Sequence, residues 1–105
     1  MKKELVTSIK YKIAISLHRL LDSRKKDKSF SSIEEEGVNS YNEIALAVDV
    51  RKATVSDAFN AKSKSGPNST TVIMIVESLG YTMLDFATIF DSISEADIVE
   101  FKKNQ

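Results

Sequence analysis

Apolar side chains recur along this 105-residue chain at the three- and four-residue spacing of α-helices. Alternation of apolar and polar residues with a period of two, which would indicate strands, is nearly absent. The clearest helical stripe lies near the start and consists of Val6, Ile9, Ile13, Leu17, Leu20 and Leu21. We therefore predict one long helix from about Lys3 to Arg24, with His18 at the edge of its apolar side.

A polar passage follows this helix from Lys25 to Asn39. It includes a run of three glutamates at 34–36, just after Ser32, which has the residue type of a helix cap. Gly37 can close the single turn that such a cap would begin. We interpret the passage as an ordered, irregular connection, and the glutamates as a solvated turn rather than a metal site or a site for an acidic partner.

Two short helices are predicted next. Ser40 and Glu43 have the spacing of a capping box, in which each side chain accepts from the other's backbone N–H. The helix that they begin is short, because Asp49 interrupts the apolar pattern. A second short helix is predicted from Arg51 to Ala61, and a polar loop from Lys62 to Asn68 follows it.

Three further helices complete the predicted fold. Asn68 or Ser69 caps the first of them, and Gly80 ends it in the left-handed conformation. Thr82 begins a helix that reaches Ile93, and Ser94 begins a last one. The sequence therefore predicts a single all-α domain over residues 1–105, with a five-helix core at about 13–93 and an extra C-terminal helix at about 94–103.

The two short helices have the features of a helix-turn-helix, in which a first helix packs across a second that can enter the DNA major groove. The crossing requires a small residue, which is Ala45, and the turn requires a residue that tolerates positive φ, which is Asp49. Val50 is placed to fill the turn, and Val55 to anchor the second helix to the core.

On these residues, Ser40 to Asn60 resembles the helix-turn-helix of the phage-repressor, or XRE (Cro-type), family. Ser69 to Phe90 is similar to the two helices that follow in that family, with the Leu79-Gly80-Tyr81-Thr82 junction and the Asp85-Phe86 pair. Ile13, Leu17 and Leu20 match the apolar spacing of its first helix. The resemblance implies a lambda-repressor-like DNA-binding domain and a role as a sequence-specific transcriptional regulator.

The resemblance also implies which side chains contact DNA. The positions that face the bases map to Lys52, Ala53, Ser56 and Asp57. The positions that contact the phosphate backbone map to Tyr41, Arg51, Thr54, Asn60, Lys62, Lys64 and Ser65.

The sequence departs from the family pattern at several positions. Asp49 stands where the turn glycine is usual, and Arg51 where the second helix usually begins with a capping Ser or Thr. Many members pair an Arg in the first helix with a Glu in the third, and the matching positions here are Leu21 and Phe59. An apolar contact between these two residues is therefore expected in place of a salt bridge.

Formal net charge is zero, with 15 basic and 15 acidic residues, but the two signs are segregated along the chain. Residues 1–28 carry nine basic and three acidic groups (+6), and residues 29–49 carry five acidic groups and no basic one (−5). Residues 50–65 carry four basic and one acidic group (+3), and residues 66–105 carry two and six (−4). The predicted second short helix and its loop are thus basic, which keeps DNA among the possible partners.

Several function classes are excluded or disfavoured. The chain has no cysteine and a single histidine, His18, so disulfides and thiolate metal sites are excluded. No phosphate-binding glycine motif or catalytic triad spacing is present, so we expect neither an enzyme nor a cofactor. No signal peptide or membrane-spanning apolar stretch is evident, so we expect a cytoplasmic protein that does not contact a membrane.

The C-terminal third is rich in large apolar residues, namely Phe86, Phe90, Ile93, Ile98, Val99 and Phe101. They can belong to the core or form a dimer seam. We favour a homodimer on double-stranded DNA that uses the last helix. The alternative is an antitoxin-type or other protein-interaction module of the same fold with weak or no DNA binding, whose protein partner, a toxin, would bind the C-terminal helix.

Overall fold

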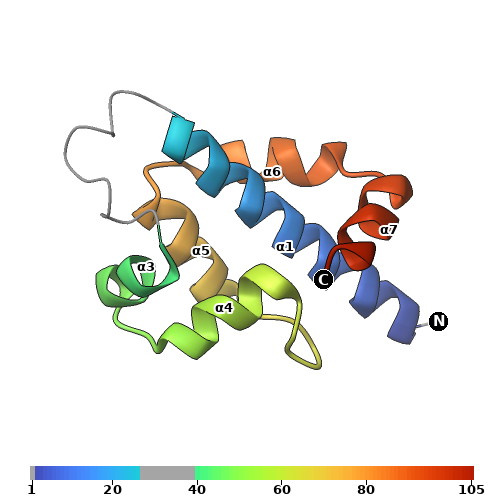
Figure 1. The fold of residues 1–105 in the computed structure, drawn as a ribbon, viewed down its shortest axis with the longest axis horizontal. Helices are drawn as coiled ribbons and strands as arrows, with labels where there is room; N and C mark the ends of the chain where they lie inside the picture. The colour runs from blue at the N-terminus through green and yellow to red at the C-terminus, as the bar shows by residue number, and fades with distance from the viewer. Residues whose placement is uncertain (1, 27–39) are drawn as a thin grey trace.

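The computed structural model describes residues 2–26 and 40–105, and within these ranges every regular element is an α-helix (Figure 1). The six helices are α1 (Lys2–Lys26), α3 (Tyr41–Val48), α4 (Lys52–Asn60), α5 (Ser69–Ser78), α6 (Met83–Ser92) and α7 (Glu95–Lys103). The all-α prediction is confirmed, with helix ends within two residues of those expected. The predicted Ser32 cap and Gly37 stop lie outside the described residues.

The helix ends follow the predicted capping chemistry. The Asn68 side chain accepts from the backbone N–H of Thr71 at 2.8 Å, so Asn68 rather than Ser69 caps α5. Gly80 has a φ of +89°, as the predicted left-handed stop requires. Thr82 with Asp85 forms a complete capping box at the start of α6.

The capping box predicted at the start of α3 forms only in part. The Ser40 hydroxyl accepts from the Glu43 backbone N–H at 3.1 Å, as expected. The return bond from the Ser40 N–H to the Glu43 carboxylate is not formed in the described part of the chain. Glu43 is one methylene longer than the aspartates that complete the boxes of α6 and α7.

Helix α1 is the central element and contacts α4, α6 and α7 (Figure 1). Its predicted stripe is buried at Leu17, Leu20 and Leu21, but burial extends to Ile15 and Ser16 on other faces. The buried Ser16 hydroxyl is satisfied inside the helix, because it donates to the Lys12 carbonyl at 2.7 Å. Since helices pack on more than one side of α1, its buried surface is wider than a single stripe.

The N-terminal end of the predicted stripe is only partly buried. Val6 is 38% exposed and Ile9 is 41% exposed. A helix of 25 residues is about 37 Å long, whereas helices of 8–10 residues reach only about 12–15 Å. The short helices therefore cover the middle and the C-terminal half of α1 and leave its first turns uncovered.

Two apolar clusters account for most of the C-terminal apolar residues. The larger cluster joins α1, α3, α4, α5 and α6 and buries Phe86, with Phe90 packed against it. The smaller cluster buries Ile93 and Ile98 against Ile15, with Phe101 beside them. Of the six apolar residues, Val99 alone is exposed, at 55%. Helix α7 thus uses its apolar side to dock on α1.

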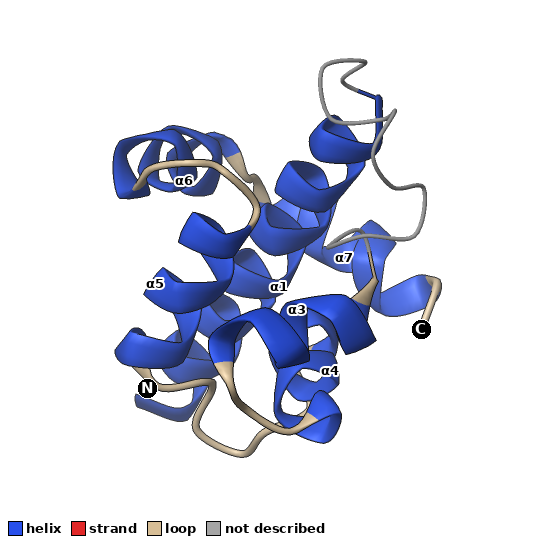
Figure 2. Cartoon of the chain, turned by 90° about the vertical axis from the view of Figure 1, so that its left-hand side faces the viewer, coloured by secondary structure: helices blue, strands red, loops and turns tan. Residues whose placement is uncertain are grey.

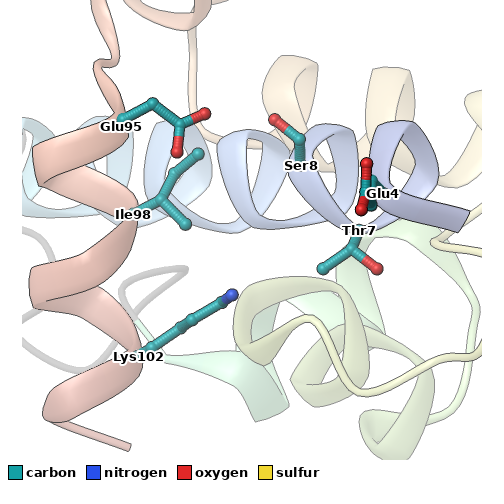
Figure 3. Close-up of a pocket in the computed structure, with 6 residues that line it drawn as sticks. All are labelled: Glu4, Thr7, Ser8, Glu95, Ile98 and Lys102. Carbon is teal, nitrogen blue, oxygen red and sulfur yellow. The ribbon is translucent and has the colours of Figure 1, made fainter. Parts of the chain in front are cut away.

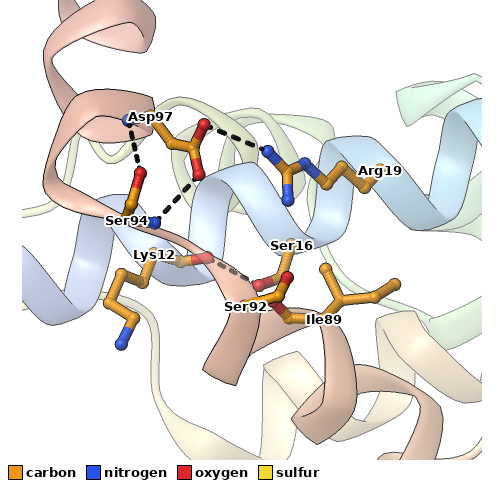
Figure 4. A network of polar contacts seen from close by, with 7 residues as sticks. All are labelled: Lys12, Ser16, Arg19, Ile89, Ser92, Ser94 and Asp97. Atoms are coloured by element: carbon orange, nitrogen blue, oxygen red, sulfur yellow. Dashed lines mark hydrogen bonds and ion pairs between the residues drawn. The ribbon is translucent and has the colours of Figure 1, made fainter.

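Polar contacts at the start of α7 reinforce this docking (Figure 4). Ser94 and Asp97 form a complete capping box, with bonds of 3.2 and 2.9 Å. An Arg19 guanidinium nitrogen on α1 lies 3.5 Å from the Asp97 carboxylate. Because both side chains are partly exposed, this ion pair adds little stability and mainly favours one orientation of α7 on α1.

The described residues contain no single helix long and apolar enough to cross a membrane. Helices α5 and α6 taken together would satisfy the same length and composition test, but they are bent by 107° relative to each other.

Candidate nucleic-acid interface

Helices α3 and α4 are joined by a tight turn in which the predicted residues have their expected conformations (Figure 2). Asp49 is in the left-handed region, at φ 58° and ψ 48°. Val50 donates its backbone N–H to the Ala45 carbonyl at 3.0 Å and packs against the core. Ala45 is buried on α3, which contacts α4 and α5. The structure therefore confirms the local geometry predicted for this helix pair.

We expect Asp49→Ala to lower the free energy of unfolding by about 1 kcal/mol, because a Cβ-bearing residue without a local polar group is disfavoured at positive φ. The same change at Asp57, inside α4, should be neutral or slightly stabilising, since Ala has the highest helix propensity. Urea denaturation of both variants measures the difference. Equal effects at the two sites would contradict the role assigned to the turn.

Three buried residues hold α4 against the rest of the domain, namely Val55, Ala58 and Phe59. The Phe59 ring is fully buried and lies between His18 of α1, at 5.3 Å between ring centroids, and Tyr41 of α3, at 4.7 Å. Leu21 belongs to the same buried cluster as Phe59. The direct contact predicted between Leu21 and Phe59 stays a prediction.

The opposite side of α4 is open to solvent. Lys52, Ala53 and Asp57 are exposed, as the predicted base-facing positions require. Ser56 is half-buried, and its hydroxyl already accepts from the Asn60 side-chain amide at 3.4 Å. The exposed face of α4 thus offers one cation, one methyl group and one carboxylate, with Ser56 less accessible than the other three.

Two of the predicted backbone-contacting residues are engaged within the protein. The Asn60 side-chain amide donates to the Ser56 carbonyl at 2.8 Å, and the Asn60 carbonyl accepts from the Gln105 side chain at 2.7 Å. Burial raises the pKa of the half-buried Tyr41, and this effect outweighs an opposing hydrogen bond with the Asn60 side chain. Tyr41 and Asn60 therefore position α3 and α4 relative to each other.

Arg51 and Thr54 lie in and beside the first turn of α4. Arg51 occupies the N-cap position, is exposed, and makes no side-chain capping bond. Its carbonyl accepts from the backbone N–H groups of Thr54 and Val55, at 3.0 and 3.3 Å. Thr54 itself is half-buried above a small hollow at the start of α5. The departure from a capping Ser or Thr leaves a cation at the positive end of the helix.

The loop after α4 presents Lys62, Lys64 and Ser65, all of them exposed. A contact that the sequence did not reveal holds this loop on α1, because the Lys10 ammonium donates to the Ser63 carbonyl at 3.0 Å. Lys10 and Ser63 are 53 residues apart, so no local pattern could have indicated their pairing. The loop is thereby fixed beside α4, with its lysines pointing into solvent.

A pocket of about 430 Å³ with polar and apolar lining lies elsewhere, between the first turns of α1 and one side of α7 (Figure 3). It brings together Glu4, Glu95 and Lys102. Among the residues that the structure describes, no group of three His, Asp or Glu side chains is arranged to hold a metal ion. The pocket therefore combines carboxylates with an ammonium group.

Comparison of the chain with protein-family models, with curated proteins and with solved structures gives no match. The features that bear on function are therefore the geometry and charge of the α3–α4 pair and of the loop that follows it.

Proposed function

We propose that this chain is a cytoplasmic, sequence-specific DNA-binding transcriptional regulator with a lambda-repressor-like domain that inserts α4 into the major groove. The observation that carries the proposal is the placement of α4. Its buried side is held by Phe59 and Val55, and its opposite side is exposed after the short turn at the left-handed Asp49. An exposed second helix of this kind has the size and shape to enter the groove.

The exposed side chains of α4 suit the base edges of the groove. Lys52 can donate to O6 and N7 of guanine, and the Ala53 methyl can contact the methyl group of thymine. Asp57 can accept from N4 of cytosine. Ser56 contributes less, because it is half-buried and bonded to Asn60.

Cations stand at both ends of α4, where the phosphate backbone would pass. Arg51 and Lys52 are exposed at its start, and Lys62 and Lys64 are exposed just after its end. Residues 50–65 carry a net charge of +3 although the whole chain is neutral. Such contacts release counterions from DNA, so the affinity should fall steeply with salt.

One observation favours the alternative, a protein-interaction module of the same fold. Asp57 is exposed in the middle of the face that would enter the groove, where its carboxylate repels phosphates. Under this alternative, α4 or α7 would bind a protein such as a toxin, and DNA affinity would be weak or absent.

A charge-reversal experiment separates the two functions. We expect the K62E/K64E variant to bind a fluorescent random-sequence duplex roughly tenfold or more weakly than wild type at about 50 mM salt, because two phosphate contacts become repulsive. The slope of log affinity against log salt should decrease in magnitude by about 1 for each lysine. Fluorescence anisotropy measures both quantities.

The matched control is K102E/K103E, which makes the same change in net charge at exposed residues of α7. We expect this control to retain most of the wild-type affinity. No binding by wild type at about 50 mM salt, or equal losses in both double variants, would refute DNA binding through α4 and its loop.

A further inference from the structure

An apolar groove of about 520 Å³ lies between the N-terminal half of α1, the first turns of α5, and α6. Its walls are formed by Ile9, Ile13, Ile73, Phe86, Ala87 and Phe90, among others. Among the described residues that line it, Asp91 is the one that carries a charge. The groove is separate from the exposed face of α4.

The apolar surface continues past the groove along α1. A neighbouring hollow of about 160 Å³ shares Ile9, Ile13 and Pro67 with the groove and extends to Val6. Leu5, the residue before Val6 and four residues before Ile9, is 61% exposed. Groove and helix end therefore form one continuous strip on which large apolar side chains face solvent, a feature typical of a protein interface.

The shape of this strip suits a helix better than a small molecule. Sites for small molecules enclose most of their ligand's surface, whereas this groove is open to solvent. The chain itself contains a helix that matches it, because the uncovered first turns of α1 expose Leu5, Val6 and Ile9 at helical spacing. In a two-fold pair, each copy offers both the exposed helix end and the groove.

Charges beside the groove are arranged to complement those of a second copy. The Lys12 ammonium of α1 lies 4.4 Å from the centroid of the Phe90 ring, and Asp91, the residue after Phe90, lines the groove. When α1 of one copy faces α6 of the other, a contact between Lys12 of one copy and Asp91 of its partner would occur twice because of the two-fold symmetry. Residues 2–13 of α1 carry four basic residues and one acidic one, whereas α6 carries two acidic residues and no basic one, so this arrangement opposes a basic segment to an acidic one.

We propose that a second copy of this chain covers the groove, forming a homodimer in which the N-terminal turns of α1 pack against α5 and α6 of the partner. This assigns the dimer to a surface other than the α7 seam suggested by the sequence, since α7 turns Ile98 and Phe101 inward. The proposal does not depend on DNA binding by α4, and its test contains no DNA.

The test is the effect of Ala87→Glu on the mass of the protein in solution. Ala87 is exposed and lines the groove, so a carboxylate there should be accepted by the monomer and excluded from the dimer. The matched control is Ala96→Glu on α7, which is exposed and, like Ala87→Glu, places the new carboxylate four residues before an acidic one. Sedimentation equilibrium should give wild type and Ala96→Glu a molecular mass of twice the 11.7 kDa of one chain. For Ala87→Glu, the dissociation constant of the dimer should be roughly tenfold or more higher than for wild type.

Further variants and measurements check that the protein is folded and distinguish this interface from the alternatives. Circular dichroism and thermal melting check that Ala87→Glu is folded; if it is not, Ile73→Lys at the partly exposed Ile73 replaces it. A monomeric wild type at all concentrations, or an Ala87→Glu dimer as tight as wild type, would overturn the proposal. If Val99→Glu is monomeric while Ala87→Glu remains a dimer, the interface lies on α7 instead. Groove-dependent binding of an apolar dye by a monomeric wild type would indicate a different occupant.

Discussion

Phe59→Ala is expected to destabilise the domain by about 3–5 kcal/mol, the usual cost of removing a fully buried phenylalanine. The ring lies between His18 and Tyr41, so its loss opens a cavity where α1, α3 and α4 meet. Total stability of a domain this size is about 5–15 kcal/mol, so the variant should be close to unfolding. Thermal melting followed by circular dichroism should show a midpoint lower by roughly 12 °C or more.

Two control variants test whether the loss of stability is specific to the position of Phe59. Phe59→Leu keeps most of the volume and should cost less than about 1.5 kcal/mol. Phe101→Ala removes the same ring from a half-buried site on α7 and should cost about 1–2 kcal/mol. If Phe59→Ala were no more damaging than Phe101→Ala, the junction of α1, α3 and α4 would not be the centre of the core.

Stability is expected to fall as the pH is lowered below about 6.5, because of His18. Burial lowers the pKa of its imidazole from the ordinary 6.5, despite a hydrogen bond to the Phe59 backbone and the nearby Asp22 carboxylate. Lys25 lowers it further. The ring packs against Phe59 of α4 and Phe101 of α7. Among the residues that the structure describes, its buried Nε2 has no hydrogen-bond partner that could stabilise the protonated ring.

The direction of this pH effect follows from the difference in proton binding between the folded and unfolded states. Because the folded-state pKa is lower than the unfolded one, the unfolded chain binds more protons between the two values. The stabilisation is complete above about 6.5 and is lost as the pH falls toward the folded-state pKa, by at most about 1.4 kcal/mol per pH unit for one proton. Urea denaturation at intervals from pH 7.5 to 4.5 measures this slope.

Two variants identify the group responsible. His18→Gln keeps an N–H donor for the Phe59 carbonyl but does not titrate, so it should flatten the profile just below pH 6.5. Asp97→Asn should leave this window unchanged, because hydrogen bonds to Ser94 lower the Asp97 pKa below its ordinary 3.8. The Asp97 contribution is therefore lost only in more acidic solution. An unchanged slope in His18→Gln would assign the pH dependence to another group.

Much of the α3–α4 unit was predictable because its determinants are local. The Ser40 cap, the left-handed Asp49 and the apolar spacing of Val55 and Phe59 all act within about four residues along the chain. Exposure of Lys52 and Asp57 followed from the same helical periodicity. Sequence patterns of this kind locate a helix, its ends and its buried face.

Other properties of the same site were not predictable. Asn60 was expected to contact a DNA backbone, but its polar groups bond to Ser56 and to Gln105, 45 residues away. Lys10 holds the basic loop on α1, and the Arg24 guanidinium donates to the Leu79 carbonyl at 3.1 Å, 55 residues away. These pairings exist only once the helices have packed, so no window of sequence contains both partners.

The sequence by itself determined the helices, their caps, the left-handed turn and the segregation of charge, because each depends on neighbouring residues or on simple counting. Tertiary structure alone decided which apolar side chains are buried against another helix. The first turns of α1 match its buried turns in pattern, yet Val6 and Ile9 face solvent because the short helices are too few and too short to cover them. Packing likewise turned Phe101 inward and left Val99 outside, and it opened the groove between α1, α5 and α6.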